Sequence, residues 1–143
     1  MTIRIATTED KDFLVANRRH IDAGLMREKV ADGQVYVAES NGEIVGWARY
    51  GLFWDNVPFL NMIYILDDYR KRGIGSALMS AWEQDMAARG HRMVLTSTQS
   101  DEAAQHFYRR LGYRDCGVFV LPGEAGELML LKELNPPKCG NPH

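Results

Sequence analysis

The chain has 143 residues, of which 45% are apolar and 25% charged, a composition that fits one folded domain and excludes a disordered chain. Its net charge of −2 argues against a broad electrostatic grip on nucleic acid. No apolar stretch approaches the roughly 18 residues of a membrane-spanning helix, so we expect neither nucleic acid nor a membrane as a partner.

The N-terminal half predicts a strand, two helices and a hairpin, in that order. We expect a short strand at residues 3–6, a helix that Thr8 or Asp10 caps and that runs to about residue 20, and a second helix at residues 25–31. Asn41 and Gly42 are a strong hairpin signal between strands at residues 34–39 and 44–53. Residues 59–66 are nearly all apolar, as expected for a central strand covered on both faces.

The C-terminal half predicts alternating helices and strands. A helix at about residues 73–89 precedes a strand at 93–98, a helix capped by Asp101 that ends at Gly112, and a closing strand pair at 113–121 and 127–134. This order predicts an α/β fold with a mixed, mostly antiparallel sheet of six or seven strands, flanked by about four helices. Residues 1–134 form one predicted domain, and residues 135–143, rich in Pro, form a tail.

Cysteine and histidine are sparse. Cys116 and Cys139 are too few for a disulfide framework, which favours two free thiols in a reducing compartment. The N-terminus lacks the pattern of a secretion signal. His20, His91, His106 and His143 are scattered without the spacing of a metal site. We therefore expect a cytoplasmic protein that binds no metal.

The most informative segment covers residues 69–78, between an apolar strand and an amphipathic helix. Its two glycines, Gly73 and Gly75, allow the backbone to turn and to approach a ligand closely. The helix start offers free N–H groups and the positive end of a dipole, with three basic residues beside it. These features predict a phosphate or pyrophosphate site, against the alternative of a helix start with solvated basic side chains.

Two common phosphate motifs fail in this segment. A P-loop would need a Lys after Gly75, and a dinucleotide-binding fingerprint would need a third Gly or Ala where Leu78 stands. What remains is Arg-x-x-Gly-x-Gly, from Arg70 through Gly73 to Gly75. This spacing resembles the acetyl-CoA loop of the GNAT superfamily of N-acetyltransferases, whose pattern is Gln/Arg-x-x-Gly-x-Gly/Ala.

A second segment supports the same resemblance. Residues 104–113 are similar to the superfamily's helix that ends in Phe-Tyr-x-x-x-Gly-Phe/Tyr, with Phe107, Tyr108, Gly112 and Tyr113 at the matching positions. The predicted element order also matches, and the resemblance spans residues 3–134. It implies the GNAT fold and an enzyme with acetyl-CoA as its cosubstrate.

The resemblance also implies which residues bind the cofactor. Backbone N–H groups would hold the pyrophosphate, near the Arg70 and Arg72 side chains; they belong to Lys71, Arg72, Gly73, Ile74, Gly75 and Ser76. The pantetheine would pair with the strand edge that includes Ile63 and Ile65, and an N–H near Ile65 would stabilise the oxyanion. Asp101 falls where many relatives have an Asn that contacts the pantetheine arm, although a helix cap explains Asp101 equally well.

The catalytic side chains are implied by the same resemblance. Tyr108 matches the general-acid tyrosine that protonates the leaving thiolate, and the alternative is a core aromatic residue beside Phe107. Asn61 stands where some relatives have a glutamate base. An amide cannot take a proton, but it can orient a water molecule, so the sequence names no base.

The acceptor site is the least defined part. Trp47, Tyr50, Trp54 and Tyr64 could form an apolar wall, although core packing explains Trp47 better. Asp22, Glu28 and Asp55 could attract a cationic amine, although most surface acids have no such role.

We therefore expect an N-acetyltransferase that moves an acetyl group from acetyl-CoA to a primary amine on a small molecule or peptide, by direct attack in a ternary complex. The alternative is a non-catalytic acyl-CoA-binding sensor or interaction module, which Asn61 in place of an acid favours. Exposed edge strands would allow a homodimer.

Overall fold

The computed structural model describes residues 1–136, where the elements follow the predicted order. The strands are β1 (Thr2–Ile5), β2 (Val35–Ser40), β3 (Glu43–Phe53), β4 (Val57–Ile65), β5 (Met93–Gln99), β6 (Arg114–Phe119) and β7 (Glu127–Glu133). The helices are α1 (Lys11–Ala16), α2 (Ala23–Ala31), α3 (Ile74–Ala88) and α4 (Ala104–Arg110), with the 3-10 helices η1 (Thr8–Asp10) and η2 (Asp67–Tyr69). Most of the predicted tail at residues 135–143, with Cys139 and His143, lies outside the described residues.

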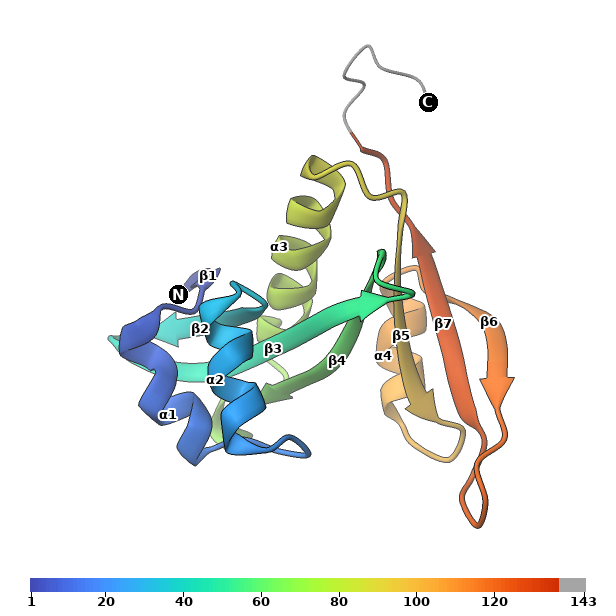
Figure 1. The fold of residues 1–143 in the computed structure, drawn as a ribbon, viewed down its shortest axis with the longest axis horizontal. Coiled ribbons are helices and arrows are strands. Elements are labelled where there is room, and N and C mark those ends of the chain that lie inside the picture. The colour runs from blue at the N-terminus through green and yellow to red at the C-terminus, as the bar shows by residue number, and fades with distance from the viewer. Residues whose placement is uncertain (137–143) are drawn as a thin grey trace. The chain divides into compact units, whose positions relative to one another are not determined.

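The strands form a sheet in the order β1-β2-β3-β4-β5-β7-β6, drawn in Figure 1. The β1–β2, β2–β3, β5–β7 and β6–β7 pairs are antiparallel, and the β4–β5 pair is parallel. The predicted mixed, mostly antiparallel sheet is therefore confirmed. The placement of residues 93–99 next to the central strand follows from the parallel pair, which joins Phe59 to Leu95 and Leu60 to Thr96.

The chain divides into two compact units, and each is described by itself. Unit 1 comprises Met1–Tyr50 and Met62–Trp82, and unit 2 comprises Gly51–Asn61 and Glu83–His143. The strands β3 and β4 and the helix α3 each contribute residues to both units.

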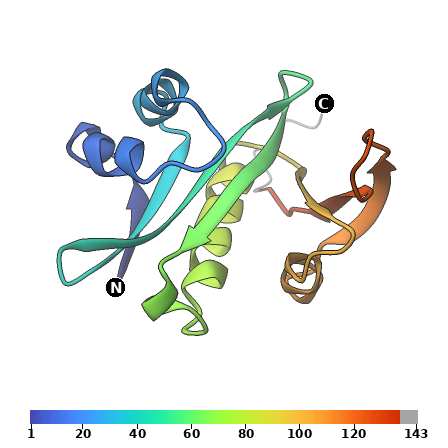
Figure 2. The same ribbon diagram turned by 90° about the horizontal axis from the view of Figure 1, so that it is seen from below.

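In unit 1, α1 and α2 lie on one face of β2 and β3, and α3 begins on the other face (Figure 2). Alternation along β2 explains this layering, because Val35 and Val37 point to one face while Tyr36 points to the other. Against α1 and α2 lies a buried cluster of Ala6, Leu14, Met26, Val30, Val35, Val37 and Trp47. On the opposite face the rings of Tyr50 and Trp82 pack at a centroid distance of 5.8 Å.

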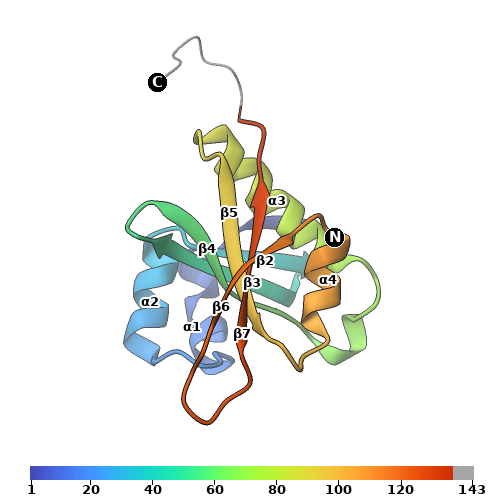
Figure 3. The same cartoon turned by 90° about the vertical axis from the view of Figure 1, so that its right-hand side faces the viewer.

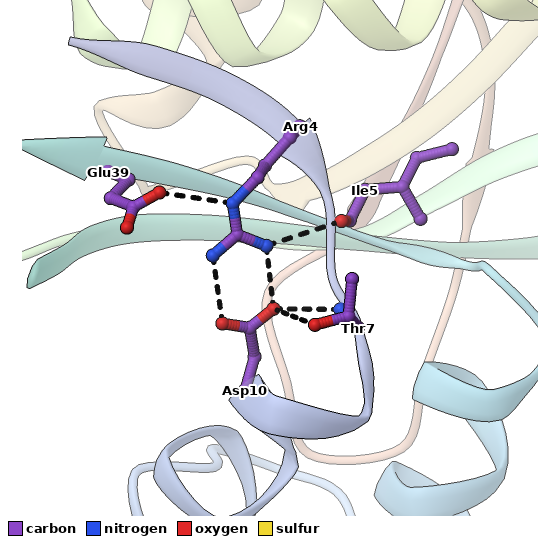
Figure 4. A network of polar contacts seen from close by, with 5 residues as sticks. All are labelled: Arg4, Ile5, Thr7, Asp10 and Glu39. Carbon is purple, nitrogen blue, oxygen red and sulfur yellow. Dashed lines mark hydrogen bonds and ion pairs between the residues drawn. The ribbon is translucent and has the colours of Figure 1, made fainter. Parts of the chain in front are cut away.

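A polar network ties the first strand to the first helix (Figure 4). Arg4 donates from Nη1 and Nη2 to both carboxylate oxygens of Asp10, at 2.7 and 2.9 Å, and from Nε to Glu39 at 3.1 Å. Asp10 also accepts from the Thr7 backbone N–H at 2.7 Å. These contacts lower the pKa of Asp10 to about 2, chiefly through the hydrogen bond from Arg4.

In unit 2, β5, β7 and β6 lie next to one another with α4 beside them (Figure 3). The ring of Tyr108 on α4 packs against that of Tyr113 at 5.8 Å. The Tyr113 hydroxyl donates to the buried carboxylate of Glu83 at 2.8 Å, and Lys132 on β7 donates to the same carboxylate at 2.7 Å. A buried acid is thus paired and hydrogen-bonded, as burial of a charge requires.

Three local expectations are wrong. The first helix ends at Ala16 and not near residue 20, because Asn17 bonds to the Phe13 carbonyl and Arg18 to that of Val15. The Asp10 side chain does not cap α1, because its carboxylate accepts hydrogen bonds from Arg4 and Thr7.

The last helix differs at its start. It begins at Ala104 after Ala103, which makes no side-chain cap, so Asp101 does not cap it. Gln105 closes this turn instead, because its amide donates to the carbonyls of Ser100 and Glu102.

Candidate functional site

The loop between β4 and α3 is shaped by two residues in the left-handed region. Lys71 has φ of 60° and Gly73 has φ of 82°. Glycine adopts this conformation without strain, whereas a side chain does so at a cost. Gly75 lies inside the first turn of α3, so only one of the two predicted glycines turns the backbone.

The start of α3 presents backbone donors. The first helical hydrogen bond runs from the Ala77 N–H to the Gly73 carbonyl oxygen at 3.0 Å. The N–H groups of Ile74, Gly75 and Ser76 precede that bond and have no helical acceptor. The Ile74 side chain is buried and anchors this turn in unit 1. The helix start therefore offers free donors at the positive end of its dipole, and such an end favours an anion.

The three basic residues of the loop have different surroundings. Arg70 donates from Nε to the Ile65 carbonyl oxygen at 3.0 Å and pairs with Asp67 at 3.1 Å. Arg70 thus fastens the loop to the end of β4. The Arg72 guanidinium lies 5.2 Å from the centre of the Tyr69 ring, and Lys71 is exposed. Neither Lys71 nor Arg72 has an ion pair within residues 1–136, so both charges remain available to a phosphate.

The end of β4 has one edge turned toward β3 and one turned away from it. The Leu66 N–H donates to the Val45 carbonyl oxygen at 2.9 Å, on the β3 side. Because N–H directions alternate along a strand, the N–H groups of Ile63 and Ile65 point to the opposite edge. Pairing with β5 involves only Phe59 and Leu60, although β4 runs on to Ile65.

The β3 strand approaches this segment closely at Gly46. A Cβ atom built on Gly46 would lie 2.7 Å from Ile65 Cδ1 and 3.1 Å from the Tyr64 carbonyl oxygen. A side chain at position 46 would therefore push the Ile65 side chain aside and press on the Tyr64 carbonyl oxygen. The segment from Met62 to Ile65 is only half-buried, so the expectation of a strand covered on both faces is wrong for this end.

Tyr108 lies in unit 2 and is only 6% exposed. Its phenol lies beside the Thr96 hydroxyl on β5. The Thr96 hydroxyl in turn donates to the Leu60 carbonyl oxygen at 3.1 Å. Burial raises the pKa of Tyr108 above its usual value of 10, so the phenol keeps its proton through the neutral range.

The other predicted residues of unit 2 are exposed. Asn61 follows Leu60 directly, and Asp101 lies in the turn before α4. Asn61 and Tyr108 belong to unit 2, while Ile63, Ile65 and residues 70–76 are gathered in unit 1.

The aromatic residues predicted to form a wall for the acceptor differ in their exposure. Trp47 is 1% exposed and belongs to the core, as its packing alternative predicted, whereas Trp54 is 77% exposed. Asp22 accepts from the Leu25 N–H at 2.9 Å and caps α2.

Two residues of interest were missed in the sequence, Thr96 and Arg49. Thr96 lies in a segment of high strand propensity, where a threonine gives no sign of a functional role. Arg49 lies two residues after Trp47 on a strand, so the two side chains share a face, and this spacing could have indicated that Arg49 is buried.

Some further features bear on the chemistry. No group of three or more His, Cys, Asp or Glu in the described part of the chain could hold a metal ion. None of its helices has the length and apolar character needed to span a bilayer. A surface hollow on unit 2 contains none of the predicted site residues; it is lined by Asn56, Val57, Gly90, His91, Arg92 and Met93.

Comparison with known proteins identifies similar sequences. A model of the acetyltransferase (GNAT) family matches residues 4–113. An uncharacterised N-acetyltransferase of Methanocaldococcus jannaschii is 33% identical over 105 residues, which cover 70% of this chain and 67% of the relative. An L-methionine sulfoximine/L-methionine sulfone acetyltransferase of Pseudomonas aeruginosa is 31% identical over 95 residues, which cover 61% of this chain and about half, 54%, of that enzyme.

Solved structures share the fold. A crystal structure of aminoglycoside 6'-N-acetyltransferase in complex with coenzyme A superimposes with a TM-score of 0.79 and covers 96% of this chain and 99% of that chain. The sequence identity is 18%, so this likeness concerns the fold.

Proposed function

The chain belongs to the acetyltransferase (GNAT) family, and we propose that it moves an acetyl group from acetyl-CoA to a primary amine by direct attack in a ternary complex. Members of this family are acyltransferases that use acetyl-CoA and an amine-type acceptor, so the chain is an enzyme of this class. The residues that act, the ternary mechanism and the kind of amine are the content of the proposal.

The observation that carries the proposal is the start of α3. Three backbone N–H groups, from Ile74, Gly75 and Ser76, lack a helical acceptor at the positive end of a helix of 15 residues. Two loop cations without ion pairs in the described residues, Lys71 and Arg72, stand beside them. These groups suit the pyrophosphate of coenzyme A, whereas Arg70 holds the loop in place through Ile65.

The end of β4 supplies the groups for the thioester. We assign the outward N–H groups of Ile63 and Ile65 to the pantetheine and the carbonyl oxygen. A backbone N–H that has no partner in the strand ladder can stabilise the negative charge that develops when the amine attacks. Gly46 supports this arrangement because it allows β3 to lie close beneath Ile65.

Proton transfer is assigned to Tyr108. Its raised pKa keeps the phenol protonated at the pH where the amine is attacking, and the phenol can give that proton to the departing thiolate. Asn61 is assigned to orient a water molecule that takes the proton of the amine. Desolvation and the charge of Asp115 raise the pKa of the Cys116 thiol, which disfavours a thiolate and a covalent acyl-enzyme at this residue.

The test is release of free thiol from acetyl-CoA with a panel of amines, together with calorimetric titration of coenzyme A. We expect amine-dependent thiol release by the wild type. The variant Gly75→Val should fold, because position 75 is helical, but its side chain should block the approach of the pyrophosphate and abolish binding. Arg72→Ala should weaken binding and reduce its salt dependence.

The alternative, a binding module without catalysis, gives a different result. A binding module would bind coenzyme A, but it would not release thiol from acetyl-CoA with any amine of the panel. Tight binding of coenzyme A by folded Gly75→Val would contradict the assignment of the loop.

A further inference from the structure

Arg49 on β3 is a buried cation with no anionic partner among residues 1–136. It is 5% exposed and lies opposite Val35 in the β2–β3 register. By alternation it shares the face of Trp47, which α1 and α2 cover. Its guanidinium donates from Nη2 to the Arg19 carbonyl oxygen at 2.9 Å and from Nη1 to the Met62 sulfur at 3.1 Å.

These two contacts leave the guanidinium without a charged acceptor. An arginine side chain carries five N–H donors, and a thioether is a weak acceptor. Burial lowers the pKa of Arg49, because the charged guanidinium loses hydration. Arg4 in the same unit shows the usual solution, because Asp10 accepts from both of its terminal nitrogens (Figure 4).

A second cation lies near Arg49. Lys29 on α2 is half-buried and donates to the Tyr50 carbonyl oxygen at 2.6 Å. Burial and the charge of Arg49 both lower the pKa of Lys29, and Asp32 opposes them without forming an ion pair. Unit 1 therefore keeps two cations in a partly dehydrated place where their charges repel each other. Such an arrangement is stabilised when an anion enters.

We propose that Arg49, with Lys29 beside it, binds a carboxylate of the acceptor, so that the enzyme acetylates an amino acid and not a polycationic amine. This inference rests on the proposed acetyl transfer. A planar guanidinium can donate two parallel hydrogen bonds to a carboxylate, which fixes the orientation of the bound molecule. Arg49 touches Met62, which precedes Ile63 on β4, so the bound carboxylate would lie beside the strand assigned to the thioester.

The side chains around Arg49 favour a singly charged group. Val35 and the Met62 thioether offer no donors, so beyond Arg49 and Lys29 nothing in the described contacts would replace the large hydration shell of a phosphate. A carboxylate needs fewer donors and loses less hydration.

The activity test compares amino acids with their primary amides. Each pair keeps the amine and the side chain but removes the negative charge, and the panel covers aliphatic, aromatic and sulfur-containing side chains. For the wild type we expect kcat/KM for the acid to exceed that for the amide by at least about tenfold, the scale of a hydrogen bond to a charged group. Arg49→Met should abolish this preference by raising KM for the acid, and Arg49→Lys should keep part of it.

A binding test does not require turnover. Calorimetry with N-acetyl-L-alanine and N-acetyl-L-alaninamide uses the atoms that acetylated amino acids share. The wild type should bind the acid more tightly than the amide, and Arg49→Met should bind both equally. Lys29→Gln should reduce the preference for the acid severalfold. Because position 29 is only half-buried, this variant replaces Arg49→Met in the test if Arg49→Met does not fold.

The control and the unfolding data separate binding from packing. Arg18→Met removes a cation and two backbone contacts from the loop after α1 and should leave the preference unchanged. Arg49→Met should unfold at the wild-type temperature or above it, because a buried charge has been removed. A lower unfolding temperature together with an unchanged preference for the acid would assign Arg49 to packing alone.

The two proposals fail in different ways. Equal kcat/KM for acids and amides, or a preference that survives both Arg49→Met and Lys29→Gln, overturns the carboxylate site while acetyl transfer stands. Absence of thiol release with all amines contradicts acetyl transfer, and calorimetry then still decides whether Arg49 binds a carboxylate.

Discussion

The hydroxyl of Thr96 donates to the main-chain oxygen of Leu60 over 3.1 Å, and these two residues form the last pair that joins β4 to β5. The same hydroxyl lies beside the phenol of Tyr108. One buried side chain therefore connects the end of the parallel pairing with the proposed general acid. Leu60 is followed by Asn61, so the bond also fixes the backbone next to that residue.

Replacing Thr96 with valine should cost both stability and activity. Valine has the same shape but leaves the Leu60 carbonyl oxygen without this donor, which should reduce the free energy of unfolding by about 1–3 kcal/mol. We also expect kcat to fall more than KM changes, because Tyr108 loses its fixed orientation. Urea unfolding and steady-state kinetics measure the two effects. Thr96→Ser keeps the hydroxyl, and its kcat should stay near that of the wild type.

Tyr108→Phe tests the acid role most directly. It keeps the ring and removes the proton, so kcat should fall by about 10²–10⁴-fold while the affinity for acetyl-CoA changes little. Tyr113→Phe is the matched control, because it also removes a buried hydroxyl, the one that donates to Glu83. The control should lose stability and keep its kcat. A Tyr108→Phe enzyme that turns over like the wild type, with chemistry rate-limiting, would leave Tyr108 as a packing residue.

The pH profile provides an independent check on Tyr108. Burial raises its pKa, so the phenol keeps its proton to a higher pH than a free tyrosine does. Any loss of rate from this residue should therefore begin at a higher pH than a free phenol would give. A decline centred below pH 10 that Tyr108→Phe removes would contradict the raised pKa.

Gly73 and Gly75 should respond in opposite ways to alanine. At Gly73, where φ is 82°, a side chain costs about 1–2 kcal/mol of stability and redirects the N–H groups that follow. At Gly75, inside the helix, alanine should raise stability by up to about 1 kcal/mol. Thermal unfolding of the two variants decides this, and equal shifts would contradict the assigned backbone conformations.

Asp10 should make folding stability depend on acid pH. Its pKa in the folded protein is about 2, below the ordinary value of 3.8, so its contribution is complete only above about pH 5 and is lost progressively as the pH falls through 2. The shift corresponds to roughly 2 kcal/mol. The wild type should lose most of this amount between about pH 5 and pH 2 in denaturant titrations, and Asp10→Asn should be less stable at pH 7 with a shallower loss.

Local patterns predicted the architecture well where the physics is local. Asn41 and Gly42 both adopt positive φ, at 52° and 79°, and close the hairpin as their residue types suggest. The apolar periodicity of α3 placed its ends within one residue of 73 and 89. Tyr108 and the loop after β4 could be named because sequence motifs mark them.

The remaining features depend on contacts between distant residues. The left-handed Lys71 has no sequence signal, since lysine rarely adopts that conformation. The half-exposed end of β4 follows from pairing that stops at Leu60 and Thr96, although residues 62–65 are largely apolar. From the sequence alone Arg49 would be predicted to be an exposed charge. The strand register places it opposite Val35.

The strand β6 has consequences for the order in which the protein opens. It lies at the end of the sheet, all of its side chains are exposed, and the register with β7 is interrupted between Asp115 and Gly117. Little apolar burial holds such a strand, so it should separate at a lower free energy than the rest of unit 2. The Phe119 backbone and the 90%-exposed Val120 would then become accessible to a protease. Brief treatment with chymotrypsin should therefore cleave after Phe119 long before it cuts at the buried Tyr108, and the amides of β6 should exchange with deuterium ahead of those of β5.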